Sequence, residues 1–393
     1  MDRPMKEFRV AITQPNIIFG GRLQVILGLV KALNELGIEP DILTLNLGFD
    51  PATIQEKYGQ DLRMRFKHIC RIFPWHLFSQ DYKILIFNFL LKFQKNKYDL
   101  IVDSGNSQIF LPKKPTILSY IHFPREYRIR NNYLLEQITS NKITRIHANK
   151  LSNRFLRGLY RLSKVRSNQV FVCNSTYTEE SLRSVYRDMT NETYIVYPPV
   201  DLSQFSCPYS QRPESIVSLG RYTPEKGQLD QIKLAEQMPE TDFKIIGFVF
   251  SQKYFDDCQA YINTHHVENV KLLPNLAFGD LISALQSSKY FLHTLENEPF
   301  GITAVQAIAA GCIPIVHDSG GQREVVPFDF LRFQSVDEIP EIIRHVEELS
   351  QDAVSKLISS LQQNARENYD AAVFHHRMVT IFSYIIERAS SKD

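Results

Sequence analysis

Two stretches of the sequence combine charged residues with glycine in a way that suits the binding of an anion. The stretch "ENEPFGITAVQAIAAGCIPIVHDSGG" carries Glu298 directly before Pro-Phe-Gly, and "SLGRYTPEKG" places Arg221 and Lys226 close behind an apolar run. An arginine fork and a lysine point charge can converge on one diphosphate, and a carboxylate can hold hydroxyl groups. Together these residues predict a site for a phosphorylated ligand that also carries hydroxyls.

A short helix is expected beside these charges. Phe300 and Gly301 precede a run of small residues that predicts a helix from Ile302 to Ala310, with Gly311 as its C′ glycine. The N-terminus of a helix offers N–H groups and a partial positive charge to a phosphate. We therefore expect the start of this helix to face the same anion.

Glycines at two other places have the same potential. Gly220 comes directly before Arg221, and the stretch "IIFGGRLQVI" places Gly20 and Gly21 between an expected strand and an expected helix. Glycine allows a backbone to approach a phosphate closely. The second stretch does not follow the G-x-G-x-x-G pattern of dinucleotide-binding proteins. From the residues alone, a tight turn at Gly20 and a solvated surface position for Arg221 and Lys226 are equally compatible with the sequence.

Four histidines require separate interpretations. His122 in "YIHFP" follows an apolar run, where a lone histidine is more often a hydrogen-bonded structural residue than a functional one. We expect His293 in "FLHTLE" to support the site, and the pair His375 and His376 to lie on a helix surface.

The elements that must position these residues alternate along the chain. Short apolar runs predict strands, and helical patterns separate most of them. One helical pattern, in "GGRLQVILGLVKALNELG", ends at Gly37. This alternation predicts an α/β protein with two doubly wound parallel sheets. The expected strands are "FRVAIT", "DILTLNL", "DLIVDS", "TILSYIHF", "VFVCNS", "SIVSLG", "FKIIGFVF", "VKLLP", "YFLHT" and "IPIVHD".

Length and composition agree with two ordinary globular domains. The chain has 393 residues, of which 44% are hydrophobic and 22% charged, and its formal net charge of +2 gives no reason to invoke nucleic acid. Its five cysteines are scattered, which argues against a disulfide framework or a zinc site. The N-terminus lacks the apolar core of a signal peptide, and no apolar run reaches the ~20 residues of a membrane-spanning helix. We expect a cytoplasmic protein.

Several motifs together resemble a known family. The two stretches quoted first, with "VFVCNSTYTEESL", "YPPVDLSQF" and the Gly20-Gly21 loop, are similar to the retaining glycosyltransferases of family 4. The motifs "SYIHFP", "VYPPVD", "LHTLENEPFGI" and "VHDSGG" resemble, more narrowly, the GDP-mannose:oligosaccharide-lipid α-1,2-mannosyltransferases of N-glycan assembly. The resemblance implies the GT-B fold, in which two Rossmann-like domains face each other across a cleft.

The resemblance also implies separate roles for the two domains. Residues 1–200 would form the acceptor domain, residues 201–370 the donor domain, and the C-terminal helix 371–393 would pack back on the first domain. The segment 196–215, rich in Pro and Ser, is the natural boundary. By position, the family's catalytic roles would fall on His122, Arg221, Lys226 and Glu298. Its donor-binding roles would fall on Gly20, Gly21, Gly220, Phe300, Gly301, Ile302 and Gln306.

One of these positions departs from the family pattern. The family has a second glutamate eight residues after the first, which holds the ribose, and here that residue is Gln306. An amide still donates and accepts hydrogen bonds but carries no charge, which weakens the interaction by about 1 kcal/mol. The sequence therefore leaves open a catalytically silent relative or a UDP-sugar enzyme beside the favoured transfer of mannose from GDP-mannose. A Rossmann oxidoreductase is supported only by the alternating pattern.

The mechanism that the resemblance implies uses no metal and no other cofactor. Positive charge grows on the transferred sugar and negative charge on the departing diphosphate, which Arg221, Lys226 and the helix N-terminus would stabilise. The family is thought to retain configuration by front-face attack, with the leaving phosphate taking the acceptor proton.

Two basic segments rich in aromatic residues suggest a membrane contact. Residues 63–78 mix Arg and Lys with Phe and Trp75, and residues 142–166 carry eight Lys or Arg and no acid. Such segments suit anionic lipid headgroups, so we expect peripheral contact with the cytoplasmic membrane face and a lipid-linked or glycan acceptor. A solvated cationic face is the main alternative. Nucleic acid is a weaker one because no motif for it is present.

Overall fold

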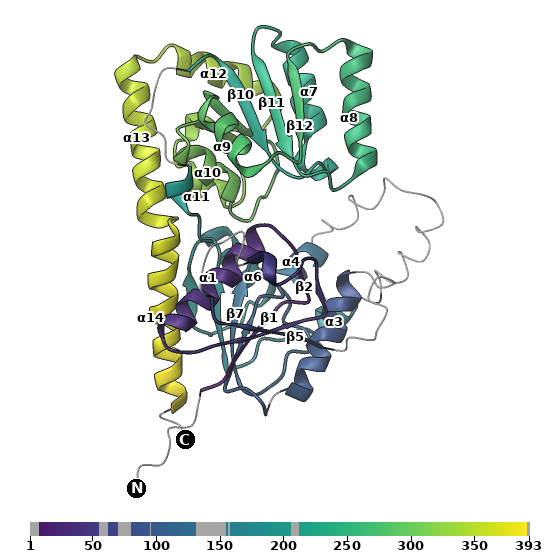
Figure 1. The fold of residues 1–393 in the computed structure, drawn as a ribbon, viewed down its shortest axis with the longest axis vertical. Helices are drawn as coiled ribbons and strands as arrows, with labels where there is room; N and C mark the ends of the chain where they lie inside the picture. Colours follow the sequence, from purple (N-terminus) through teal and green to yellow (C-terminus); the bar gives the residue numbers. More distant parts are fainter. Residues whose placement is uncertain are drawn as a thin grey trace. The chain divides into compact units, whose positions relative to one another are not determined.

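The structure is a computed structural model that describes residues 8–54, 62–69, 80–94, 96–130, 155, 158–205 and 212–390. The chain divides into two compact units. Unit 1 comprises Met1–Pro199 with Ala372–Asp393, and unit 2 comprises Val200–Ala371. Each unit has its own parallel sheet with helices packed on it (Figure 1). The α/β class predicted from the sequence is confirmed.

Unit 1 contains a seven-stranded sheet in the order β5-β3-β1-β6-β7-β8-β9, and every neighbouring pair is parallel. Most of its central strands are buried along their whole length, which explains their uninterrupted apolar sequences. The strands are β1 Val10–Thr13, β3 Asp41–Thr44, β5 Arg65–His68, β6 Leu100–Asp103, β7 Thr116–Ile121, β8 Gln169–Cys173 and β9 Thr193–Ile195, and a separate pair joins β2 Asn16–Ile17 to β4 Asn46–Leu47.

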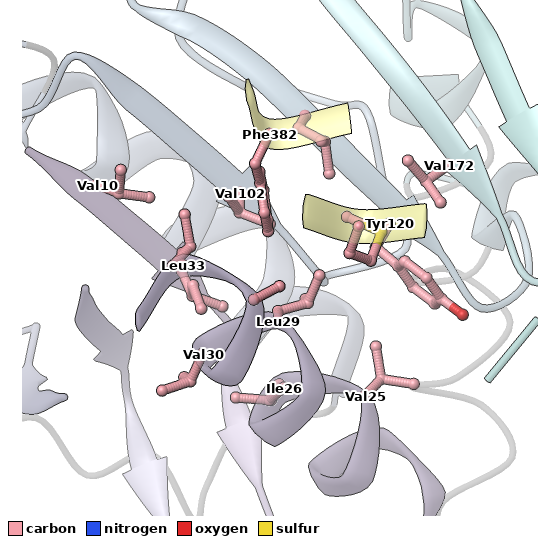
Figure 2. Close-up of a cluster of buried hydrophobic side chains, with 14 of the residues drawn as sticks. Val10, Val25, Ile26, Leu29, Val30, Leu33, Val102, Tyr120, Val172 and Phe382 are labelled. Atoms are coloured by element: carbon pink, nitrogen blue, oxygen red, sulfur yellow. The ribbon is translucent and has the colours of Figure 1, made fainter. Parts of the chain in front are cut away.

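The core of unit 1 joins two helices from opposite ends of the chain. Helix α1 (Gly21–Glu35) buries the apolar positions that the sequence periodicity identified, and α14 (Ala371–Ser390) contributes to the same cluster (Figure 2). Burying a Leu, Ile or Phe side chain stabilises a fold by about 1.5–3 kcal/mol. Phe374, Met378 and Phe382 therefore fasten α14 to unit 1. Further helices of unit 1 whose bounds lie within the described residues are α3 Gln80–Leu91, α4 Arg125–Arg130 and α6 Thr176–Val185, with the 3-10 turn η2 Lys92–Gln94.

Of the two adjacent histidines in α14, only one is exposed in the way that the sequence suggested. His376 is exposed, as expected, whereas His375 is half-buried and forms an ion-pair contact with Glu35 of α1. The difference arises because His375 lies on the side of α14 that faces α1.

Unit 2 contains a six-stranded parallel sheet in the order β12-β11-β10-β13-β14-β15. Its strands are β10 Ser215–Leu219, β11 Asp242–Gly247, β12 Val270–Pro274, β13 Tyr290–His293, β14 Ile313–His317 and β15 Arg332–Phe333. Its α-helices are α7 Gln228–Gln237, α8 Gln252–His265, α9 Phe278–Gln286, α10 Ile302–Ala309, α11 Gln322–Val325, α12 Ile339–Glu347 and α13 Gln351–Asn368. The 3-10 turns are η4 Leu202–Gln204, η5 Pro224–Lys226, η6 Asp329–Leu331 and η7 Val336–Glu338.

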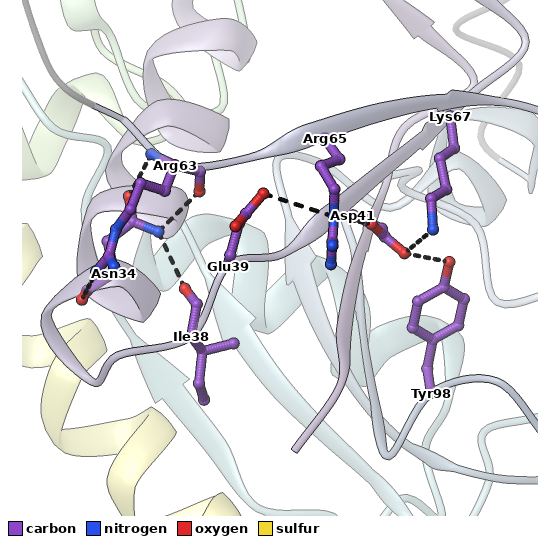
Figure 3. Close-up of polar contacts among 8 residues, drawn as sticks. All are labelled: Asn34, Ile38, Glu39, Asp41, Arg63, Arg65, Lys67 and Tyr98. Atoms are coloured by element: carbon purple, nitrogen blue, oxygen red, sulfur yellow. Dashed lines mark hydrogen bonds and ion pairs between the residues drawn. The ribbon is translucent and has the colours of Figure 1, made fainter. Parts of the chain in front are cut away.

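An edge strand that the sequence pattern did not predict lies within the basic segment 63–78. Strand β5 is mostly exposed, so its sequence RFKH has no apolar run. Instead, Arg65 and Lys67 hold it to β3 through Asp41, at 3.0 and 2.5 Å (Figure 3). Tyr98 donates a hydrogen bond to the same carboxylate at 2.8 Å. Residues 70–79, with Trp75, and most of residues 142–157 lie outside the described residues.

Both sheets reverse their strand order at one position. In unit 1, β1 lies between β3 and β6, and in unit 2, β10 lies between β11 and β13. In parallel α/β sheets, the crevice at the carboxyl ends of the strands beside such a switch point is the usual place for a ligand. The candidate ligand-binding residues are therefore those that follow β1 and β6 in unit 1, and β10 and β13 in unit 2.

Candidate functional site

A polar pocket lies at the switch point of unit 2. Strand β10 ends at Leu219 and strand β13 at His293, and the turn η5 with the start of α7 completes the wall. The lining residues are Ser218, Leu219, Gly220, Lys226, Gln228, Gln231, Leu292, His293 and Thr294.

An ion pair joins the two stretches with which the sequence analysis began. Lys226 Nζ lies 2.7 Å from Glu298 Oε2, and the side chains are 17% and 20% exposed. The aliphatic stem of Lys226 packs beside Gly220, where an added Cβ would lie 3.5 Å from Lys226 Cδ. A pair that is mostly removed from water fixes the position of both charges more firmly than a surface pair does.

The loop after β14 holds the backbone of Glu298 in place. The Gly321 N–H donates to the Glu298 carbonyl oxygen at 2.8 Å. A Cβ at Gly320 would lie 2.4 Å from that oxygen, so the close approach of the two loops requires glycine. Gln322 donates from Nε2 to the Leu295 carbonyl oxygen at 3.0 Å and secures the same segment. The "SGG" motif therefore acts by shaping the loop that carries Glu298.

Helix α10 follows Glu298 as the sequence predicted. Gly301 is its N-cap residue, with φ of 111°, and the helix runs from Ile302 to Ala309. Gly311 has φ of 84° at the C′ position, which confirms its expected role. The Phe300 side chain is buried and packs edge-on against Tyr369, with ring centroids 5.2 Å apart. The start of α10 is thus anchored from the core of unit 2.

Arg221 and Gln306 occupy more exposed positions around this centre. The Arg221 side chain is exposed and its guanidinium lies 5.2 Å from the centre of the Phe250 ring, in a cation–π contact. The Arg221 carbonyl oxygen accepts a hydrogen bond from Gln228 Nε2 at 2.8 Å. Gln306 is half-buried on the second turn of α10. The structure thus brings Lys226 to Glu298, while Arg221 stacks on an aromatic ring.

His293 lies beneath the ion pair. It is 4% exposed, and its Nε2 is 3.6 Å from Glu298 Oε2. Burial, and then the nearby charge of Lys226, lower the pKa of His293 to about 3. The imidazole is therefore neutral at physiological pH, with one N–H donor and one acceptor nitrogen.

The switch point of unit 1 carries a different set of groups. The Thr13 hydroxyl at the end of β1 donates to Asp103 Oδ1 at the end of β6, at 3.0 Å. The Ser104 N–H donates to the Thr13 carbonyl oxygen at 2.9 Å. Burial raises the pKa of Asp103 to about 7. The two strand ends are thus tied together by a carboxyl group that is half protonated near neutral pH.

His122 lies next to this pair of strand ends. Its Nε2 is 2.8 Å from the Ser104 hydroxyl, and its backbone N–H donates to Asn106 Oδ1 at 2.8 Å. Burial, with the charge of Arg22, holds the pKa of His122 well below its usual value. The imidazole is therefore neutral, with the Ser104 hydroxyl bonded to one ring nitrogen, and the backbone of the residue is held by Asn106.

The Gly20-Gly21 pair opens helix α1 directly after β2. Gly20 is the N-cap residue, with φ of 137° that side chains rarely tolerate, and Gly21 is the first helical residue. This places glycine at a helix N-terminus, as the sequence suggested.

Sequence reasoning gave little weight to His293 and omitted Asp103, Ser104 and Gln228. The signal for His293 and Asp103 was a polar residue at the carboxyl end of an apolar strand, where a parallel sheet collects its functional groups. Within the described ranges, no group of three or more His, Cys, Asp and Glu side chains is placed to hold a metal ion. No helix of those ranges is long and apolar enough to cross a membrane.

Two family models match the chain in succession. Residues 19–204 match the model described as Glycosyltransferase Family 4, and residues 204–368 match the model described as Glycosyl transferases group 1. Among solved structures, a sucrose-phosphate synthase from Thermosynechococcus elongatus has a TM-score of 0.73 at 16% identity, covering 97% of this chain and 100% of that one. A glycosyltransferase from Rickettsia africae has a TM-score of 0.65 at 14% identity, covering 97% and 99%. At these identities the likeness shows the fold.

Curated relatives share a single description, "GDP-Man:Man(3)GlcNAc(2)-PP-Dol alpha-1,2-mannosyltransferase". The relative from Xenopus laevis is 31% identical over 231 residues, 51% of this chain and 44% of the relative. The relative from Dictyostelium discoideum is 25% identical over 290 residues, 65% of this chain and 56% of the relative. The matched part thus spans about half the length of these relatives. With the two family models and the GT-B structures, these matches confirm the resemblance seen in the sequence: the chain belongs to glycosyltransferase family 4 and has its GT-B fold.

Proposed function

We propose that this protein is a retaining hexosyltransferase that moves mannose from GDP-mannose to a lipid-linked or glycan acceptor. The observation that carries the proposal is the Lys226–Glu298 pair at the switch point of unit 2. It combines a cation for a diphosphate with a carboxylate for sugar hydroxyls, at the place where an α/β sheet binds its ligand. Unit 2 would bind the donor and unit 1 the acceptor.

The donor phosphates would be held by Arg221, Lys226 and the backbone amides at the start of α10, after Phe300. Gly220 leaves room for the Lys226 stem, and α10 is eight residues long, enough to present N–H groups and a partial positive charge. Glu298 would accept hydrogen bonds from the sugar hydroxyls, and Gln306 from the ribose.

The chemistry follows from the charges that develop as the sugar leaves. Cleavage of the anomeric C–O bond leaves negative charge on the diphosphate, and Lys226 is already fixed beside the site of that charge by its pair with Glu298. The departing phosphate oxygen would take the proton of the acceptor hydroxyl as the new C–O bond forms on the same face.

Unit 1 would contribute His122 beside the transferred sugar and Gly20-Gly21 beside the phosphates. The neutral imidazole of His122 supports this role because a neutral group can bond a hydroxyl without opposing the positive charge that grows on the sugar. Arg22, one residue beyond the glycine pair, lies near enough to His122 to lower its pKa.

The choice of mannose and of a lipid-linked acceptor rests on the relatives' shared description. The basic segments 63–78 and 142–166 would bring the protein to the anionic cytoplasmic face of a membrane, where such an acceptor resides. Within the described part of the second segment, Phe155 and Leu162 are exposed apolar side chains beside Arg161 and Lys164.

A second candidate is a catalytically silent relative that binds nucleotide sugars. The observation that favours it is Gln306, a neutral residue at the family's second glutamate position. A silent relative would bind GDP-mannose without releasing GDP from it.

The test is an assay of nucleotide release and sugar transfer with GDP-mannose, UDP-glucose and UDP-N-acetylglucosamine. Oligosaccharides on a lipid diphosphate and free glycans serve as acceptors. The proposal expects transfer from GDP-mannose that is lost in Glu298→Ala. Transfer from a UDP-sugar alone would overturn the choice of donor, and donor binding without turnover would favour the silent relative.

A further inference from the structure

The pocket of unit 2 contains buried hydrogen-bonding groups that the proposed donor contacts do not use. Neither ring nitrogen of His293 has a hydrogen-bond partner among the described residues. Gln228, which is 1% exposed, leaves its Oε1 without a partner there as well. A buried polar atom without a partner is costly, so native proteins carry few of them. Three such atoms on two side chains of one pocket point to a partner that arrives in another state of the site.

The geometry around Glu298 indicates what that partner is for His293. Glu298 Oε2 lies 2.7 Å from Lys226 Nζ and 3.6 Å from His293 Nε2. The first distance is a strong charged hydrogen bond, and the second is slightly longer than a hydrogen bond. A small rotation of the Glu298 side chain would bring the imidazole within reach. One carboxylate oxygen thus faces two possible donors and is bonded to one.

Binding of the donor would alter this balance. The proposed function, on which this inference rests, gives Lys226 a second anion in the form of the diphosphate. A diphosphate carries more negative charge than one carboxylate, so it draws the ammonium group toward itself. Glu298 then loses its charged partner, and a donor within reach offsets that loss because the carboxylate lies mostly out of water.

We propose that His293 is a positioning residue that takes over Glu298 from Lys226 when a nucleotide diphosphate binds. The neutral imidazole donates its Nε2–H to Glu298 Oε2 and keeps the carboxylate directed toward the sugar. Lys226 is released to stabilise the departing phosphate. A neutral donor suits this exchange because it adds no second positive charge that would hold the leaving group.

Three variants separate positioning from a structural role. His293→Phe keeps an aromatic ring but removes the donor, His293→Gln restores an N–H at a similar reach, and His345→Phe makes the same change at an exposed histidine of α12. We expect kcat for sugar transfer from GDP-mannose to fall about tenfold or more in His293→Phe, the value of a hydrogen bond to a charged group. The Kd for GDP should rise as well, by up to about tenfold, because the hand-over accompanies GDP binding and the variant lacks the second donor for Glu298. His293→Gln should recover most of the activity, and His345→Phe should match the wild type.

An unchanged kcat or an unchanged GDP affinity in His293→Phe would overturn the hand-over, and so would a failure of His293→Gln to recover activity, which would indicate a structural role. If the wild type transfers no sugar from any nucleotide donor, the proposed function itself fails, which is a distinguishable result.

A second measurement follows His293 in the wild type and uses a variant only to assign its signals. In 15N-histidine-labelled wild type, long-range 1H–15N spectra report the tautomer and hydrogen bonding of each imidazole, and the His293 signals are those absent from His293→Gln. Saturation with GDP should shift the Nε2 signal of His293 while the ring stays neutral between pH 6 and 8. An unshifted signal in the GDP complex, or a protonated ring, would contradict the proposal.

Discussion

The two switch points have the same topology but opposite chemistry. In unit 1, the ends of β1 and β6 are tied by a hydrogen bond from Thr13 to Asp103, and the carboxyl group is fully buried. In unit 2, the ends of β10 and β13 line a pocket, and the carboxylate of Glu298 beside it is paired with Lys226 and partly exposed. Burial raises the pKa of Asp103 to about 7, whereas Glu298 has a cation at 2.7 Å.

The same strand order thus carries a closed, hydrogen-bonded pair of strand ends in unit 1 and a charged pocket in unit 2. A charged and partly open switch point suits a ligand that brings its own charge, such as a diphosphate. A closed one beside a neutral imidazole suits the orientation of a hydroxyl group, and His122 with Ser104 has this character. The comparison therefore supports the proposal that unit 2 stabilises the charge of the leaving group, and variants in either unit can test it.

The largest effect is expected from Lys226→Ala. Removal of the ammonium group takes away a preorganised charge at the leaving phosphate, which typically costs two to three orders of magnitude in kcat. Steady-state kinetics of transfer from GDP-mannose measure it. Lys233→Ala, an exposed lysine on α7, is the matched control and should leave kcat unchanged. A Lys226→Ala enzyme with nearly full activity would remove the distinction between the two switch points.

Asp103→Asn tests, through the pH dependence of stability, whether the Asp103 carboxyl group is protonated in the folded protein. The folded-state pKa of about 7 lies above the usual aspartate value of 3.8. The folded protein therefore binds more protons than the unfolded chain between about pH 4 and 7, and its stability falls as pH rises through that window. The slope contributed is up to about 1.4 kcal/mol per pH unit.

Denaturant unfolding across pH 4 to 8 would measure this slope for both proteins. Asp103→Asn should flatten the decline. The buried Glu126, whose pKa is also raised, interacts with Asp103 and raises its pKa further, so the difference between the two proteins reports this pair of carboxyl groups. Parallel pH profiles for wild type and variant would mean that Asp103 is ionised in the folded state.

His122→Phe should have a smaller effect that is confined to the sugar. We expect kcat/KM for transfer to fall about fivefold, since a neutral hydrogen bond of this kind contributes about 1 kcal/mol. The Kd for GDP should not change. Calorimetric titration with GDP beside transfer kinetics would separate the two quantities, and a matching loss of GDP affinity would place His122 with the phosphates instead.

The sequence predicted those features of the structure that depend on residues close together in the chain. The apolar periodicity of α1 and the glycine that ends α10 are local features, and both predictions are confirmed. Strand β5 was missed because an exposed edge strand needs no apolar run, and Asp41, 24 residues from Arg65, supplies its attachment.

The Lys226–Glu298 contact joins residues 72 positions apart. The sequence showed both charges but not that they meet. His293 lies in an apolar strand, and only the folded pocket shows that its ring nitrogens lack partners. Such contacts are tertiary, so no local pattern encodes them.

The smallest effect is expected from Tyr98, which donates a hydrogen bond to Asp41 of β3, next to the edge strand β5. Tyr98→Phe removes the hydrogen bond to Asp41 and should destabilise the fold by about 1 kcal/mol, without a change in kcat. Denaturant unfolding and the transfer assay check both parts. A loss of activity would show that the cluster in Figure 3 affects the reaction as well as the fold.

The central claim is that the switch point of unit 2 binds a nucleoside diphosphate sugar. A thermal-shift titration with GDP-mannose, GDP, UDP-glucose and UDP tests it most directly, on the wild type, Lys226→Ala and Gln306→Glu. A ligand at 100 times its Kd stabilises the folded state by about 2.7 kcal/mol, which raises the melting temperature. The account predicts a shift with GDP compounds in the wild type, a weaker one in Lys226→Ala, and several-fold tighter binding in Gln306→Glu. No shift of the wild type with any of these nucleotides would contradict it.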